Sequence, residues 1–88
     1  MGETARIRRT ESGLTNNMKR KHRAILVAVG QNIKRIRKAK NLTQYYIQHA
    51  TGIDRSDISR IENGQKNVEL VTLIKIAEAL GVDIKELF

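Results

Sequence analysis

The segment from Asp54 to Gly64 reads D-R-S-D-I-S-R-I-E-N-G and concentrates side chains that make directed hydrogen bonds. If the segment is a helix with 3.6 residues per turn, Ile58 and Ile61 point inward together. Glu62 then falls near the edge of the buried face. The outward face and its N-terminal flank carry the remaining polar side chains: Arg55, Ser56, Ser59, Arg60 and Asn63.

The chemistry open to this face is recognition by hydrogen bonding. An arginine presents two parallel N–H donors that match O6 and N7 of guanine, and a serine hydroxyl donates or accepts at either kind of base pair. Asp57, on the opposite flank, could orient Arg60, accept from a cytosine amino group or simply face solvent. An ordinary solvated helix also presents a polar face, so this face alone leaves both interpretations open.

Other chemistries find no support in the composition. The 88 residues include no cysteine, and the two histidines, His22 and His49, lack metal-ligand spacing. Paired carboxylates, a nucleophile beside a base and a phosphate-binding glycine loop are all missing. We therefore expect no metal, no cofactor and no enzymatic activity.

The net charge of +8 arises from 17 basic and 9 acidic residues, and seven of the basic residues lie in the first 23 positions. Such a balance favours a polyanionic partner, although a basic run also serves solubility alone. No apolar segment approaches the roughly 20 residues that span a bilayer. We expect a cytoplasmic protein without a membrane partner.

The pattern along the chain predicts one all-α domain of five short helices over residues 18–88, preceded by a flexible basic arm over residues 1–17. Ile25, Val29, Ile33 and Ile36 predict a helix over about 19–40, in which Gly30 marks a break or a close contact.

Capping residues delimit the later helices. Helices are predicted over 44–51, with Ile47 and Ala50 inward, over 55–63, over about 69–80 and over 84–88. Their boundaries are assigned to Asn41, Thr43, Gly52, Asp54, Gly64, Gly81 and a capping box of Asp83 and Glu86. The second and third helices, joined by a turn at Gly52, form a helix-turn-helix over about 43–63.

The run L-T-Q-Y-Y-I-Q-H-A-T-G-I-D-R-S-D-I-S-R-I-E-N-G, followed by K-N and an apolar helix ending A-L-G-V, resembles the Cro/phage-repressor (Xre-type) helix-turn-helix family. The resemblance covers about Gly30 to Phe88 and implies a lambda-repressor-like fold that binds double-stranded DNA and regulates transcription. D-R-S-x-I-S-x-I-E with K-N is also similar to the controller proteins of restriction–modification systems. One departure is Val68, where many relatives have proline.

The resemblance implies roles for individual residues. It implies that four side chains read bases: Arg55, Ser56, Ser59 and Arg60. It implies that four others contact the DNA backbone: Gln44, Asn63, Lys66 and Asn67. Arg37 and Glu62 match a structural salt bridge between the first and third helices. Lys34, Arg35, Lys38 and the basic arm could add phosphate contacts.

A two-fold dimer on a palindromic operator is expected, because one recognition helix reads too few base pairs. Ile84, Leu87 and Phe88 are its candidate contacts, unless they complete the core. Two alternatives remain open on the same fold: the antitoxin of a toxin–antitoxin pair, with a toxin as protein partner, and a coactivator-type module that binds protein.

Overall fold

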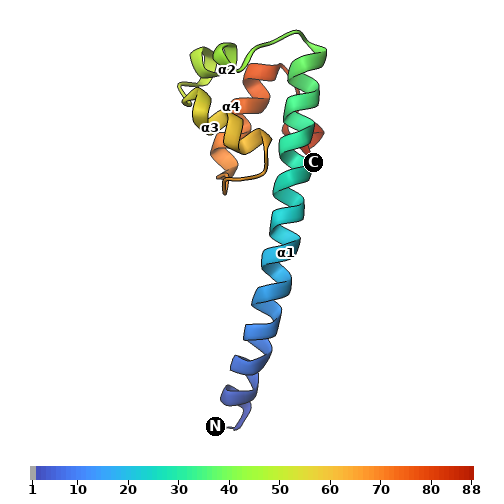
Figure 1. The fold of residues 1–88 in the computed structure, drawn as a ribbon, viewed down its shortest axis with the longest axis vertical. Helices are drawn as coiled ribbons and strands as arrows, with labels where there is room; N and C mark the ends of the chain where they lie inside the picture. Colours follow the sequence, from blue (N-terminus) through green and yellow to red (C-terminus); the bar gives the residue numbers. More distant parts are fainter. Residues whose placement is uncertain (1) are drawn as a thin grey trace.

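The computed structural model describes the backbone of residues 2–88 and the side chains of residues 19–88, and all regular structure in this range is helical (Figure 1). The elements are α1 (Gly2–Ala39), α2 (Gln44–Thr51), α3 (Arg55–Glu62), α4 (Leu70–Leu80) and the 3-10 helix η1 (Ile84–Leu87). The all-α prediction is confirmed. The fifth predicted helix is a single 3-10 turn of four residues, so four α-helices are present in the described part.

Helix α1 begins at Gly2, not near Lys19 as predicted from the apolar period. Extending an existing helix adds a hydrogen bond for each residue fixed, so continuation needs no apolar face of its own. Its N-terminal half projects beyond the other elements, and the molecule measures 56 × 21 × 21 Å (Figure 1). The backbone shows no break at residue 17. The flexibility predicted for residues 1–17 stays a prediction, because their side chains lie outside the described residues.

Local signals set the ends of the shorter helices. Thr43 accepts a hydrogen bond from the backbone N–H of Tyr46, at 3.0 Å, and caps α2. Gly52 and Gly81 close α2 and α4 in the left-handed conformation, with φ of 78° and 71°. The predicted capping box at the start of η1 is present. These predictions are confirmed.

The core lies between the C-terminal half of α1 and the bundle of α2, α3, α4 and η1. Its apolar members come from every element: Val29, Ile33, Ile36, Ile47, Ile58, Ile61, Leu73, Ile76, Ala77, Leu80 and Leu87. A hydrogen bond of 3.0 Å from the Asn32 amide to the Leu87 carbonyl ties α1 to the C-terminal turn. Among the residues with described side chains, α1 is therefore anchored by packing through its C-terminal half.

Two sequence-based placements were wrong, and one open alternative is decided by burial. Ile25 is 54% exposed, because no other element packs against α1 that far toward its N-terminus. Ala50 is exposed on α2 and does not face inward. For Leu87 a dimer contact and a place in the core were both open, and the side chain is fully buried in the core. An apolar period in the sequence predicts which side of a helix faces the core. It does not predict how far along that helix the neighbouring elements extend.

Among residues 2–88, no helix combines the length and the apolar character that crossing a membrane requires.

Candidate nucleic-acid interface

Helix α3 is seated against α1 by direct backbone contact as well as by apolar packing. Ile58 and Ile61 are buried, as their spacing predicted. Opposite them lies Gly30, where an added Cβ would stand 2.3 Å from the carbonyl oxygen of Ile61 and 2.7 Å from that of Glu62. α1 continues through Gly30 without a break, so this glycine marks the predicted close contact. No larger residue fits there unless one of the helices shifts.

A buried ion pair joins the same two helices. The Nε of Arg37 lies 2.6 Å from Oε2 of Glu62, and its Nη2 lies 3.0 Å from Oε1, so the contact is bidentate. Arg37 also donates to the Leu42 carbonyl at 2.8 Å, and the Gln44 amide donates to Oε1 of Glu62 at 3.0 Å. Glu62 therefore faces inward and connects α1, α2 and α3.

The N-terminus of α3 is held by two acceptors. Asp54 accepts from the backbone N–H of Ser56 at 3.3 Å and from the Ser56 hydroxyl. The hydroxyl hydrogen bond, followed by the backbone hydrogen bond and the charge of Arg55, holds the pKa of Asp54 below its ordinary value. From α2, the side-chain oxygen of Gln48 accepts from the backbone N–H of Arg55 at 2.7 Å. Two N–H groups left free by the helix start are thus satisfied.

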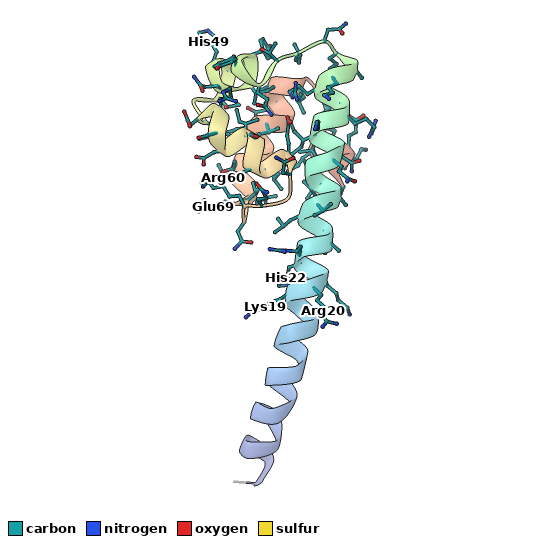
Figure 2. All side chains as sticks on the ribbon, viewed as in Figure 1. Lys19, Arg20, His22, His49, Arg60 and Glu69 are labelled. Atoms are coloured by element: carbon teal, nitrogen blue, oxygen red, sulfur yellow. The ribbon has the colours of Figure 1, made fainter. Side chains whose placement is uncertain are left out.

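The side chains predicted to read bases lie on the outward face of α3, and they differ in exposure and in contacts. Arg60 and Ser56 are exposed, and Ser59 is half-buried. The guanidinium carbon of Arg55 stands 5.1 Å from the centre of the Tyr45 ring on α2. Figure 2 shows Arg60 at the end of the domain from which α1 projects. Within residues 19–88, no hydrogen bond or ion pair engages the Arg60 side chain.

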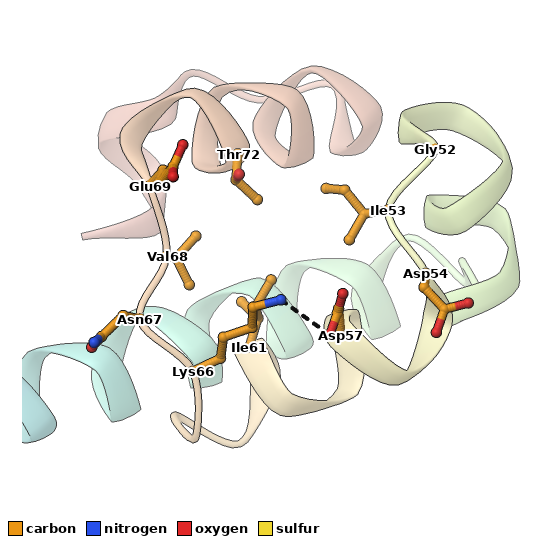
Figure 3. Close-up of a pocket in the computed structure, with 10 residues that line it drawn as sticks. All are labelled: Gly52, Ile53, Asp54, Asp57, Ile61, Lys66, Asn67, Val68, Glu69 and Thr72. Atoms are coloured by element: carbon orange, nitrogen blue, oxygen red, sulfur yellow. Dashed lines mark ion pairs between the residues drawn. The ribbon is translucent and has the colours of Figure 1, made fainter.

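The loop after α3 brings the predicted backbone contacts to the same edge. Asn63 and Asn67 are exposed, and Nζ of half-buried Lys66 lies 3.0 Å from Oδ1 of Asp57. Asp57 is paired with Lys66 of the loop and makes no ion pair with Arg60, whereas its acceptance from a cytosine amino group stays a prediction. The pair borders a cavity of about 480 Å³ between α3, the loop and α4 (Figure 3). The ion pair between Lys66 and Asp57 holds the loop after α3 against that helix. This loop contains Val68 at the position where many relatives have proline.

No sequence pattern predicted a role for Tyr45 or Gln48. Both lie on α2 and both act on Arg55, one through its guanidinium and the other through its backbone N–H. Ten residues separate Tyr45 from Arg55, and their contact depends on the angle between two helices. No local pattern carries that information.

Two short helices joined by a left-handed glycine turn, with a polar face outward on the second, define a helix-turn-helix protein. Residues 33–87 match the family model described as Helix-turn-helix, and the chain belongs to this family. It is similar to Control protein C.MunI of Mycoplasma sp., with 42% identity over 65 residues that cover 73% of this chain and 88% of that protein.

Solved structures agree with this placement. The restriction-modification controller protein C.AhdI of Aeromonas hydrophila is similar with a TM-score of 0.71 and 43% identity, over 74% of this chain and 98% of that chain. The controller protein C.Esp1396I, solved as a tetramer in complex with its natural 35 base-pair operator, has a TM-score of 0.64 and 32% identity, over 72% and 93% of the two chains.

Proposed function

We propose that this protein is a sequence-specific regulator of transcription of the controller type, which places α3 in the major groove of double-stranded DNA. The main observation in support of the proposal is the difference between the inner and outer sides of α3. Its inner side is fixed by Ile58, Ile61 and Glu62, while Arg60 on its outer side has no partner among the described side chains. The similarity to a controller protein that binds an operator supports the same assignment.

Base reading is assigned to four side chains of unequal freedom. Arg60 and Arg55 supply guanidinium forks suited to guanine. Ser59 can donate or accept. Ser56 gives its hydroxyl hydrogen to Asp54, so toward DNA its oxygen acts as an acceptor, suited to the amino group of adenine or cytosine.

Backbone contact is assigned to Gln44, Asn63, Lys66 and Asn67. The Gln44 amide uses one N–H on Glu62 and retains a second, which can donate to a phosphate while the first steadies α3. Lys66 likewise has ammonium hydrogens beyond the one directed at Asp57. Such contacts position the protein on the duplex and do not select its sequence.

A homodimer is the proposed binding form, and the structure revises its candidate surface. Ile84 is half-buried against the core, which leaves Phe88, 63% exposed, of the original three candidates. Leu70, Val71 and Ile74 form a further exposed apolar group on α4, at spacings that place them on one side of the helix. We assign the dimer contact to these α4 residues and Phe88.

No enzymatic activity and no cofactor are part of this proposal. The cytoplasm, where the DNA of a bacterial cell is accessible, is the proposed location. In the antitoxin alternative, a toxin would bind as well, and co-purification of a protein partner from the native source would show it.

The deciding experiment selects bound sequences from random double-stranded DNA and measures the affinity of variants for the selected site. Arg60→Ala should lose about 1–3 kcal/mol on that site and relax preference at one base position. Arg35→Ala removes the same charge from the exposed side of α1 and should leave base preference unchanged. Equal losses for Arg60→Ala on selected and random DNA would reduce this arginine to an electrostatic role. Failure of the wild-type protein to enrich any sequence would refute the proposal.

A further inference from the structure

The first half of the chain is strongly unbalanced in charge. From residue 12 to residue 53 it contains no aspartate or glutamate, but it contains nine lysines and arginines. Five consecutive residues, Lys19–Arg23, read K-R-K-H-R, and all five are exposed. Within residues 19–88, neither ion pair involves this run. Its positive charges are therefore available to an external anion.

The run lies on the part of α1 that projects from the domain. The helical turn places its side chains on different sides of α1. At about 100° per residue, Lys19 and Arg23 fall within about 20° of Gly30. This is the side of α1 that carries the α3 contact. Lys21 falls on the opposite side and Arg20 about a quarter turn away. Figure 2 shows Lys19 on the side of α1 on which the domain lies and Arg20 on the other.

The side that bears Lys19 and Arg23 runs directly into the edge assigned to phosphate contact. The backbone of Gly64, between Asn63 and the loop, touches α1 at Val27: an added Cβ on Gly64 would lie 2.7 Å from Cγ2 of Val27. With a rise of 1.5 Å per residue, Arg23 stands about 6 Å along α1 beyond Val27, and Lys19 about 12 Å beyond it. No other element covers this part of the helix (Figure 1).

We propose that Lys19 and Arg23 form a second DNA-contact surface, the α1 stripe, which binds phosphates flanking the segment read by α3. The proposal rests on the proposed function, and it assigns DNA contact to a part of the chain outside the family match at residues 33–87. A chain of phosphates is the partner that fits, because the stripe continues the line of Asn63, Lys66 and Asn67 with cations only. It adds affinity without adding base preference.

The chain offers a matched control for this proposal. K19Q/R23Q removes one lysine and one arginine from the stripe, and R20Q/K21Q removes the same two charges from other sides of the same turns. Binding to the selected site is measured between 50 and 200 mM salt, on a duplex trimmed to the recognised bases and on one with about 10 further base pairs on each side, one helical turn. Circular dichroism reports the helix content of each variant.

For K19Q/R23Q we expect the slope of log affinity against log salt to fall by about 1.8 per protomer, at about 0.9 for each phosphate contact. Its loss of affinity relative to wild type should shrink about tenfold per protomer between 50 and 200 mM salt, and it should gain little from the flanking base pairs. R20Q/K21Q and the charge-conserving K19R/R23K should keep most of the wild-type slope and flank dependence.

Equal effects of the two glutamine variants would overturn the proposal, since general charge would then explain them. So would an unchanged slope for K19Q/R23Q, or a loss confined to binding of phosphatidylglycerol vesicles, which would assign the stripe to a membrane surface. If wild type binds and Arg60→Ala impairs it while K19Q/R23Q does not, only the stripe is refuted. If wild type selects no DNA, both proposals fail.

Discussion

Replacing Arg37 with methionine should destabilise this protein far more than removing the charge of Asp57, although each change breaks one ion pair of α3. The side chains of the Arg37–Glu62 pair are 9% and 1% exposed, whereas those of Lys66 and Asp57 are 41% and 35% exposed. Methionine keeps much of the arginine volume, so Arg37→Met removes the charge and the hydrogen bonds to Glu62 and Leu42 with little loss of packing. Arg37→Met leaves the Glu62 carboxylate buried with only the Gln44 amide as a donor.

The magnitude follows from that burial. Removing one partner of a buried pair costs about 3–5 kcal/mol, because the remaining charge stays desolvated without compensation. A half-exposed surface pair such as Lys66–Asp57 contributes about 0–1 kcal/mol, so Asp57→Asn should cost no more than that. A chain of 88 residues is stable by about 4–13 kcal/mol at about 0.05–0.15 kcal/mol per residue. A loss of about 3–5 kcal/mol is therefore a large share of the stability of this protein.

Urea denaturation at neutral pH, followed by circular dichroism, gives the free energy of unfolding of each variant. The double variant Arg37→Met with Glu62→Leu should recover most of the loss, because no charge then remains in the core. Two results would refute the reasoning. One is a loss of under about 1 kcal/mol for Arg37→Met. The other is a double variant no more stable than the single one, which would attribute the cost to packing.

Three further outcomes are expected. Gly30→Ala should lower the free energy of unfolding by about 1–3 kcal/mol in urea denaturation, since the methyl group meets the Ile61 carbonyl and outweighs alanine's higher helix propensity; a gain in stability would show that α1 moves aside. Because the pKa of Asp54 is lowered on folding, its contribution is present above about pH 4 and is lost as pH falls through the lower folded pKa; the difference in melting temperature between wild type and Asp54→Asn should vanish toward pH 2 and stay constant from pH 5 to 7. Leu70→Lys should turn a dimer into a monomer in sedimentation, and an unchanged dimer would remove α4 from the interface.

Features of the fold that depend on a few neighbouring residues were accessible from the sequence. The cap at Thr43, the left-handed turn at Gly52 and the cap at Asp54 each rest on one side chain or one φ angle within four residues. The inward phase of Ile58 and Ile61 rests on helical spacing alone. With these, the outward face of α3 follows by elimination.

Features that depend on the distance between elements were not accessible. The exposure of Ile25 reflects where the domain ends beside α1, and the contact of Asp57 with Lys66 reflects how the loop folds back on α3. The pairing of Arg37 with Glu62 came from the family resemblance, since 25 residues separate them and no period links them. The sequence pattern predicts which side of each helix is apolar, but it does not predict which element packs against that side.

The contacts of Arg55 show why recognition by this protein depends on α2 as well as α3. The Arg55 backbone N–H is held by Gln48, and its guanidinium stands over the ring of Tyr45, both on α2. A stacked guanidinium loses less freedom when it meets a base than one that moves freely in solvent, so part of the ordering cost is met before DNA binds. Arg60, without such support, must be ordered by the DNA itself. A change at Tyr45 should therefore alter the preference of the proposed Arg55 contact while leaving that of Arg60 intact, although Tyr45 lies on the helix that precedes the recognition helix.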